Sequence, residues 1–137
     1  MRKLRLVTFF SLFLLSACSP QQKYTSVSEA IKSVEHNMTQ IESSVEAHID
    51  GIQPISYKLD NKEYIRVYEF GSKEKRDLGN KHFEEKIQLL SSHAPIVYQS
   101  GYYLVLYYSN ANSTTRTPKL TETNYGEKIQ KALISIE

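Results

Sequence analysis

Histidine, cysteine and carboxylate side chains are the groups through which this chain could bind a metal or exchange protons. The four histidines are His36, His48, His82 and His93. Their spacings of 12, 34 and 11 residues place no two of them one helical turn apart, as a pair of metal ligands on a helix would be. The motif His-Glu-x-x-His is absent, and Cys18 is the only cysteine. The sequence therefore predicts no metal site and no cofactor.

A serine and a lysine in the middle of the chain match a known nucleophile pattern. Ser72-Lys73-Glu74-Lys75 resembles the Ser-x-x-Lys motif of penicillin-recognising enzymes. The two other motifs of those enzymes, Ser-Asp-Asn and Lys-Thr-Gly, are absent from this sequence. A helix cap at Ser72 explains the serine equally well. The adjacent acids Glu84 and Glu85 point about 100° apart on a helix and cannot act together on one bond. We therefore expect no catalytic residue.

Tyrosine is the most abundant aromatic residue, with ten copies. An aromatic platform could stack sugars or bases, whereas tyrosines in a sheet also pack as ordinary strand residues with a polar tip. Sheet packing is the preferred interpretation, and a glycan-binding surface stays open as an alternative. The tyrosines in predicted strands are Tyr57, Tyr64, Tyr68, Tyr98, Tyr102, Tyr103, Tyr107 and Tyr108.

The first 17 residues are typical of an export signal. Arg2, Lys3 and Arg5 form a basic start, and residues 6–15 form an apolar run that is shorter than the roughly 20 residues of a membrane-spanning helix. The chain then turns polar at Ser19-Pro20-Gln21-Gln22. We expect residues 1–17 to be a signal peptide that is removed after export.

The end of this segment, Leu15-Ser16-Ala17-Cys18, resembles the lipobox of bacterial lipoproteins. The resemblance implies cleavage before Cys18, a diacylglyceryl group on the Cys18 sulfur and an acyl group on its freed amine. It also implies a protein held by this lipid anchor on the outer face of the cytoplasmic membrane. Two or more acyl chains anchor a protein stably, where a single chain would be marginal.

Length and charge limit the number of domains and the kinds of partner expected for the exported part. The chain has 137 residues with 17 Lys and Arg against 15 Asp and Glu, enough for one domain. Three of the basic residues lie in the signal, so 14 basic and 15 acidic side chains remain, which excludes a nucleic-acid footprint. With its single cysteine at Cys18, the domain has no internal disulfide and depends on core packing.

The elements follow from the apolar spacing. Residues 18–25 are the lipidated cysteine and a polar tether, whose seven residues from Ser19 to Thr25 reach at most about 25 Å. Ser26 and Glu29 form a capping box, and an apolar stripe of alternating three and four residues predicts a helix over 27–49. The same stripe could form a coiled-coil seam, although packing on the domain's own sheet is preferred.

Two hairpins and two further helices follow. Apolar and polar residues alternate on both sides of Asp60-Asn61 and predict a hairpin over 55–70. Strand-forming residues on both sides of Ser100-Gly101 predict a second hairpin over 95–108. A helix over 73–91, with Gly79 allowing a close approach, separates the two hairpins. Asn124 is the predicted cap of a last helix.

This order, α-β-β-α-β-β-α, predicts a single α+β domain over residues 26–137: a mostly antiparallel four-stranded sheet with three helices on one or both faces. The run Glu63 to Phe70, the charged helix and the paired tyrosine-rich strand are similar to small uncharacterised lipoproteins of Gram-positive bacilli, which implies no activity.

The combination of a short tether and no catalytic constellation favours a membrane-anchored, non-enzymatic binding domain. Its expected partner is an envelope protein, a peptide or wall material. The alternatives are a small envelope hydrolase or enzyme inhibitor, and a tyrosine-lined glycan binder. The hydrolase alternative requires a pocket that gathers His82 or His93 with Asp77 or Glu69.

Overall fold

The computed structural model describes residues 24–136, which hold three α-helices, two short 3-10 helices and five strands. In chain order they are α1 (Val27–Lys32), β1 (Thr39–Ile41), η1 (Val45–Ala47), β2 (Ile55–Lys58), β3 (Tyr64–Glu69), α2 (Lys73–Gln88), β4 (Ile96–Ser100), β5 (Tyr103–Tyr108), η2 (Leu120–Glu122) and α3 (Gly126–Ile134). The predicted signal peptide and Cys18 lie outside the described residues.

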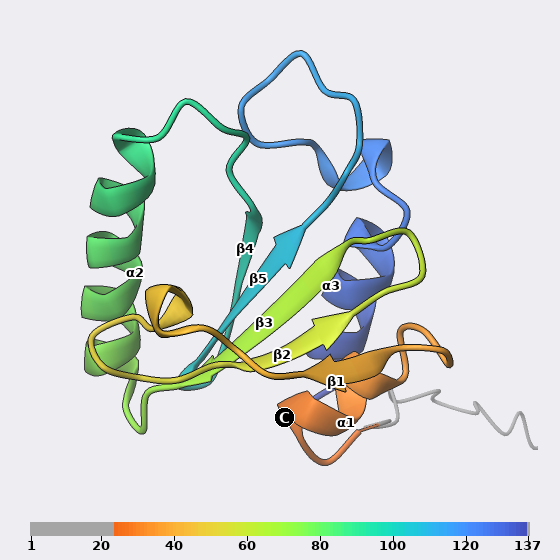
Figure 1. The fold of residues 1–137 in the computed structure, drawn as a ribbon. Coiled ribbons are helices and arrows are strands. Elements are labelled where there is room, and N and C mark those ends of the chain that lie inside the picture. Colours follow the sequence, from red (N-terminus) through yellow and green to blue (C-terminus); the bar gives the residue numbers. More distant parts are fainter. Residues whose placement is uncertain (1–23, 137) are drawn as a thin grey trace, which may run out of the picture.

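The strands form one sheet in the order β1-β2-β3-β5-β4, and every neighbouring pair is antiparallel (Figure 1). The α+β class with three helices and an antiparallel sheet is thereby confirmed. The predicted number of four strands, and with it the order α-β-β-α-β-β-α, is wrong, because β1 adds a fifth strand at one edge.

This extra strand comes from the segment predicted as the first helix. α1 ends at Lys32, and the Ser33 hydroxyl donates to the Ala30 carbonyl at 2.6 Å. The chain then runs extended, and Gln40 pairs with Tyr57 of β2. β-branched residues in β1 favour a strand, and pairing satisfies the backbone groups at the edge of β2. The helix over 27–49 and a coiled-coil seam along it are therefore wrong.

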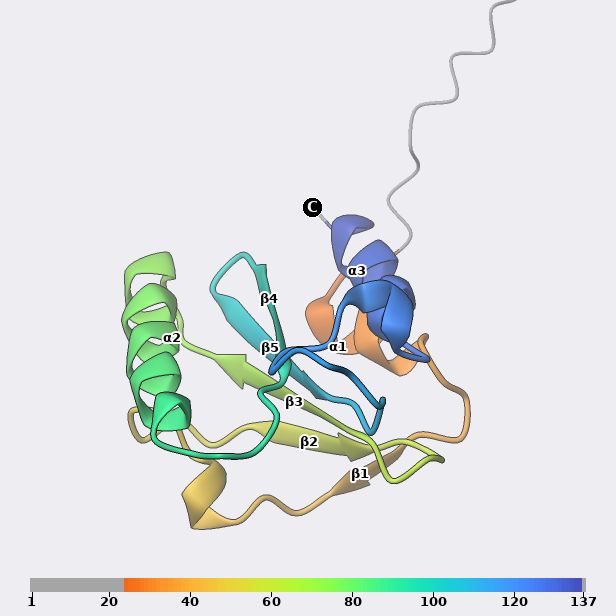
Figure 2. The same ribbon diagram turned by 90° about the horizontal axis from the view of Figure 1, so that it is seen from above.

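Helices cover both faces of the sheet, with α2 on one side and α1 and α3 on the other (Figure 2). The split follows the strand alternation: Val105 and Tyr107 pack towards α1 and α3, whereas Leu104 and Leu106 pack towards α2. All four are fully buried, so β5 is apolar on both faces, as its sequence predicts. The described helices and strands and both buried clusters lie within residues 24–136.

Both predicted hairpins are confirmed. Tyr57 pairs with Ile65 in the first, and Tyr98 pairs with Val105 in the second. Gly101, at the turn of the second hairpin, has a φ of +55°, a left-handed value that glycine adopts without steric cost.

α2 begins where the sequence predicts, with the Ser72 hydroxyl accepting from the Lys75 backbone N–H at 3.2 Å. It ends at Gln88, three residues before the predicted end. Gly79 packs against the aromatic ring of Phe70, and a Cβ atom there would collide with that ring. The predicted close approach at Gly79 is therefore confirmed.

The cap of the last helix is not Asn124. The capping side chain is Thr123, one residue before Asn124, and its hydroxyl accepts from the Gly126 backbone N–H at 3.0 Å. It also donates to the Leu120 carbonyl in η2 at 2.9 Å, so one side chain joins the two helical segments.

A buried carboxylate ties the turn between β2 and β3 to the far end of β5. Glu63 is 1% exposed and accepts from the Tyr107 hydroxyl at 2.7 Å. It also accepts from the Asn110 backbone N–H at 3.3 Å. Tyr107 in turn accepts from the Tyr125 backbone N–H at 3.3 Å, just before α3. Burial and this contact with Glu63 raise the pKa of Tyr107, so the hydroxyl stays a donor.

We expect Gly79→Ala to destabilise the domain by about 1–3 kcal/mol, because overpacking against Phe70 outweighs the roughly 1 kcal/mol that alanine gains in a helix. Urea unfolding of the single variant and of Gly79→Ala with Phe70→Leu measures this, and the smaller leucine should restore most of the loss. A single variant more stable than wild type would contradict the tight contact.

We expect Tyr107→Phe to lower the free energy of unfolding by about 1–3 kcal/mol, because the Glu63 carboxylate and the Tyr125 N–H each lose a buried partner. The urea midpoint should fall with an unchanged slope. Tyr64→Phe is the matched control on β3, since no hydrogen bond of its hydroxyl is found among the described residues, and it should change stability little. Equal stability of the two variants would show that the Glu63 network is not a major stabilising element.

Candidate functional site

Two hollows lie on opposite faces of the sheet. The first, which we call the α1/α3 groove, has a volume of about 650 Å³. The second, which we call the α2 pocket, has a volume of about 290 Å³ and is bounded by α2, η1, the sheet and residues 92–95. The groove is the larger of the two.

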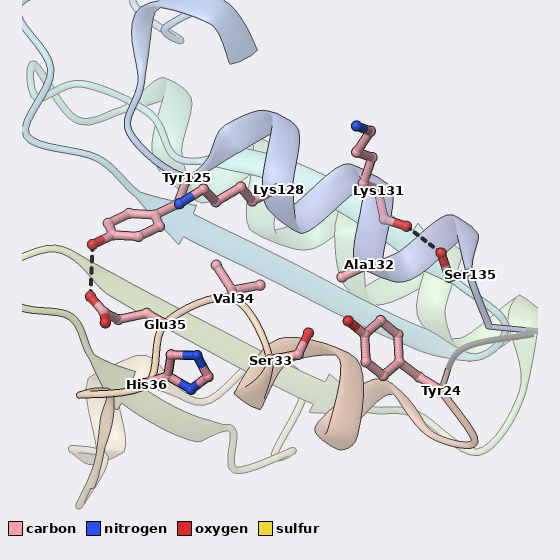
Figure 3. A pocket seen from close by; sticks show the side chains of 10 residues that line it. All are labelled: Tyr24, Ser33, Val34, Glu35, His36, Tyr125, Lys128, Lys131, Ala132 and Ser135. Atoms are coloured by element: carbon pink, nitrogen blue, oxygen red, sulfur yellow. Dashed lines mark hydrogen bonds between the residues drawn. The ribbon is translucent and has the colours of Figure 1, made fainter.

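The α1/α3 groove is lined by polar side chains from the end of α1 and along α3 (Figure 3). The Tyr125 hydroxyl donates to the Glu35 carboxylate at 2.8 Å and so bridges the two walls. The Lys128 ammonium lies 5.5 Å from the centre of the Tyr125 ring, a cation–π contact. The lining residues are Tyr24, Ser33, Val34, Glu35, His36, Tyr125, Lys128, Lys131, Ala132 and Ser135.

Hydrogen bonds set the protonation of the bridge between Glu35 and Tyr125. The Asn37 backbone N–H and then the Tyr125 hydroxyl lower the pKa of Glu35. The same contact favours the neutral phenol and raises the pKa of Tyr125 to about 12. At neutral pH the groove therefore presents a charged carboxylate and a neutral tyrosine beside Lys128.

The groove has the groups to bind a polar ligand, but its serine is not set up as a nucleophile. The Ser33 hydroxyl donates to the Ala30 carbonyl at the end of α1, rather than to a base. A carboxylate, an imidazole and an ammonium group along one groove suit a ligand of mixed charge, such as a polypeptide segment.

The α2 pocket is built around Arg66 of β3. The guanidinium carbon lies 4.8 Å from the centre of the Tyr108 ring, and the guanidinium donates to the Tyr108 hydroxyl at 3.3 Å. Tyr68 lies beside it and donates to the Ala47 carbonyl at 2.6 Å. Burial raises the pKa of Tyr108, whereas Arg66 lowers it. Phe83, Ile87 and Leu90 add an apolar wall from α2 and the residues after it.

The four histidines lie in three places on the described structure. His36 lines the α1/α3 groove, whereas His48 and His93 line the α2 pocket. His82 forms a surface pair with Asp50 at 2.8 Å. Residues 24–136 contain no group of three side chains arranged to hold a metal ion.

The arrangement that a hydrolase requires does not form around the predicted residues. His82 contacts Asp50 rather than Asp77, and Asp77 pairs with Arg76 at 2.7 Å. His93 lies in the α2 pocket, whose lining includes neither Asp77 nor Glu69. Ser72 acts as a helix cap, and Glu84 accepts from Asn80 at 3.0 Å. These contacts give the hydrolase alternative no support.

The tyrosines do not form one exposed platform. Tyr57, Tyr68, Tyr98 and Tyr107 are buried in the two clusters, as sheet packing predicts. Tyr102 is the exposed ring among those in the predicted strands, and it stacks on Tyr103 with ring centres 4.8 Å apart. This stacked pair is the most exposed tyrosine surface that the predicted strands offer to a sugar.

The sequence patterns do not identify Arg66, Glu35 and Tyr125 as site residues. For Arg66 a signal existed, because strand alternation places it on the same face as Tyr68 and Phe70. An arginine within an apolar strand face is costly to bury unless a polar group contacts it, so a partner on that face is expected. For Glu35 and Tyr125 no sequence signal existed, since their contact joins residues 90 positions apart.

The chain matches no protein-family model, no curated protein and no solved structure among known proteins. Within residues 24–136, no helix combines the length and the apolar character that crossing a bilayer requires. The function of the chain must therefore be inferred from its own residues.

We expect Glu35→Gln to shift the ionisation of Tyr125 from a pKa of about 12 towards its ordinary value of 10.0, because the charge that stabilises the neutral phenol is removed. NMR of protein labelled with ¹³C at the tyrosine ring measures this titration. Glu127→Gln removes an α3 carboxylate that does not bond to Tyr125, so it is the matched control. An unchanged Tyr125 titration in Glu35→Gln would contradict the bridge across the groove.

Proposed function

We propose that this protein is an exported lipoprotein, anchored through Cys18 on the outer face of the cytoplasmic membrane, with a non-enzymatic binding domain. The lipobox-like sequence Leu15-Ser16-Ala17-Cys18 supports the anchor. The expected modification is a diacylglyceryl group on the sulfur and an acyl group on the amine of Cys18.

The observation that carries the proposal is the short distance along the chain between Cys18 and the α1/α3 groove. Tyr24, the first described residue, lines the α1/α3 groove, and Ser26 caps α1 with its hydroxyl accepting from Glu29 at 3.1 Å. A tether of seven residues separates this helix from Cys18. The groove thus lies within about 25 Å of the proposed anchor, near enough for a partner in or on the membrane.

The chemistry of the groove suggests the kind of partner. Glu35, Lys128 and His36 give it both charges and several hydrogen-bonding groups. Such a lining suits an extended peptide or an exposed segment of an envelope protein better than an apolar molecule. We propose such a segment, or polar wall material, as the partner.

The anchor is tested by the intact mass of the protein from the membrane fraction of a bacterial host. Wild type should lack residues 1–17 and carry a lipid-sized mass increment, and Cys18→Ser should keep its signal and carry none. Ser19→Ala, beside the modified residue, is the matched control and should behave as wild type. Mass is the deciding measurement, because an uncut signal segment also retains a chain at the membrane. An unmodified wild-type mass would overturn the anchor.

A further inference from the structure

Arg66 is a charge on a face of β3 whose other side chains, Tyr64 and Tyr68, are aromatic. It points from β3 into the layer between the sheet and α2, where Tyr68, Phe83 and Leu106 are buried. Its guanidinium forms no salt bridge with any carboxylate in residues 24–136, and its polar contacts are to tyrosine. This half-buried guanidinium has five N–H donors. Its hydrogen-bond partners among the described residues are the hydroxyls of Tyr108 and Tyr68, neither of which carries a charge that would neutralise it.

The α2 pocket around Arg66 has an apolar wall and a rim rich in donors. Phe83, Ile87 and Leu90 form the apolar wall. The rim carries the Lys86 ammonium and the rings of His48 and His93. At about 290 Å³, the pocket has the volume of roughly ten water molecules, which suits a small molecule rather than a polypeptide.

The one carboxylate in the lining does not neutralise Arg66. The Glu46 carboxylate is held by its own backbone N–H and by the Ser44 hydroxyl, which lower its pKa, and Lys86 and His48 add to this effect. The Lys86 ammonium donates to the Glu46 carbonyl at 3.2 Å and stays at the rim. The pocket therefore keeps an excess of positive charge and of hydrogen-bond donors.

We propose that the α2 pocket binds a small organic anion, with its carboxylate or phosphate group on the Arg66 guanidinium and its apolar part against Phe83 and Ile87. The planar fork of an arginine matches the two oxygens of such a group. This inference rests on the proposed role as a binding domain, at a second site across the sheet from the groove, and it does not depend on the anchor at Cys18.

The test uses the chain from Ser19 to Glu137, which includes every described helix and strand and lacks Cys18. Benzoate, phenyl phosphate, inorganic phosphate and uncharged benzyl alcohol are titrated while amide NMR shifts are recorded. Benzoate, phenyl phosphate or both should bind and shift signals of β3, β5 and α2, and benzyl alcohol and inorganic phosphate should bind at least tenfold more weakly. Which of the two organic anions binds more tightly identifies the oxyanion.

Variants assign the binding to Arg66. Arg66→Gln should weaken binding of the organic anion at least tenfold, because it removes the charged fork. Arg66→Lys keeps the charge without the fork and should bind with intermediate affinity. Lys86→Gln, at the exposed rim, should weaken binding about two- to fivefold without risk to folding. Lys81→Gln, elsewhere on α2, makes the same charge change outside the pocket and should bind as wild type.

Equal binding by wild type and a folded Arg66→Gln, or equal binding of benzoate and benzyl alcohol, would overturn the proposal. Urea unfolding establishes that Arg66→Gln is folded, and Lys86→Gln serves as the deciding variant if it is not. If the full chain is lipid-modified at Cys18 while residues 19–137 bind no organic anion, this site alone is refuted. If residues 19–137 bind the anion while the full chain carries no lipid, the anchor alone is refuted.

Discussion

The buried contact between Glu63 and Tyr107 holds the two halves of the domain together. Glu63 lies at the turn of the first hairpin, and Tyr107 lies near the end of the second. A carboxylate that is 1% exposed is costly without donors, so the Tyr107 hydroxyl that β5 brings to Glu63 stabilises the fold. Through the Tyr125 N–H the same hydroxyl also fixes the start of α3, and with it one wall of the α1/α3 groove.

The parts that could be predicted from sequence are those with local causes. Hairpin turns, the Ser72 cap and the two apolar faces of β5 are encoded within a few residues. Residues 33–49 could not be predicted, because their apolar spacing suits a helix whereas the free edge of β2 favours a strand. Residues 24–136 include the whole sheet but not Cys18, so the strongest sequence motif remains a prediction.

The candidate sites show the same division. His36, His48 and His93 are noticeable in the sequence, yet each is only a wall residue of a hollow that other residues define. Arg66 and Glu35 define those hollows through partners 42 and 90 residues away. Their roles depend on tertiary contacts that no spacing rule describes. Charge inside an apolar strand pattern is the one local signal that would have identified Arg66.

Neighbouring residues of β5 serve opposite sides of the molecule. Tyr107 faces α3 and meets Tyr125 of the groove, whereas Tyr108 faces α2 and meets Arg66 of the pocket. A single peptide bond is therefore the shortest covalent path between the two candidate sites. Ligands on the two sides do not compete for space. Any displacement of β5 along its axis would move Tyr107 and Tyr108 together and so change both candidate sites at once.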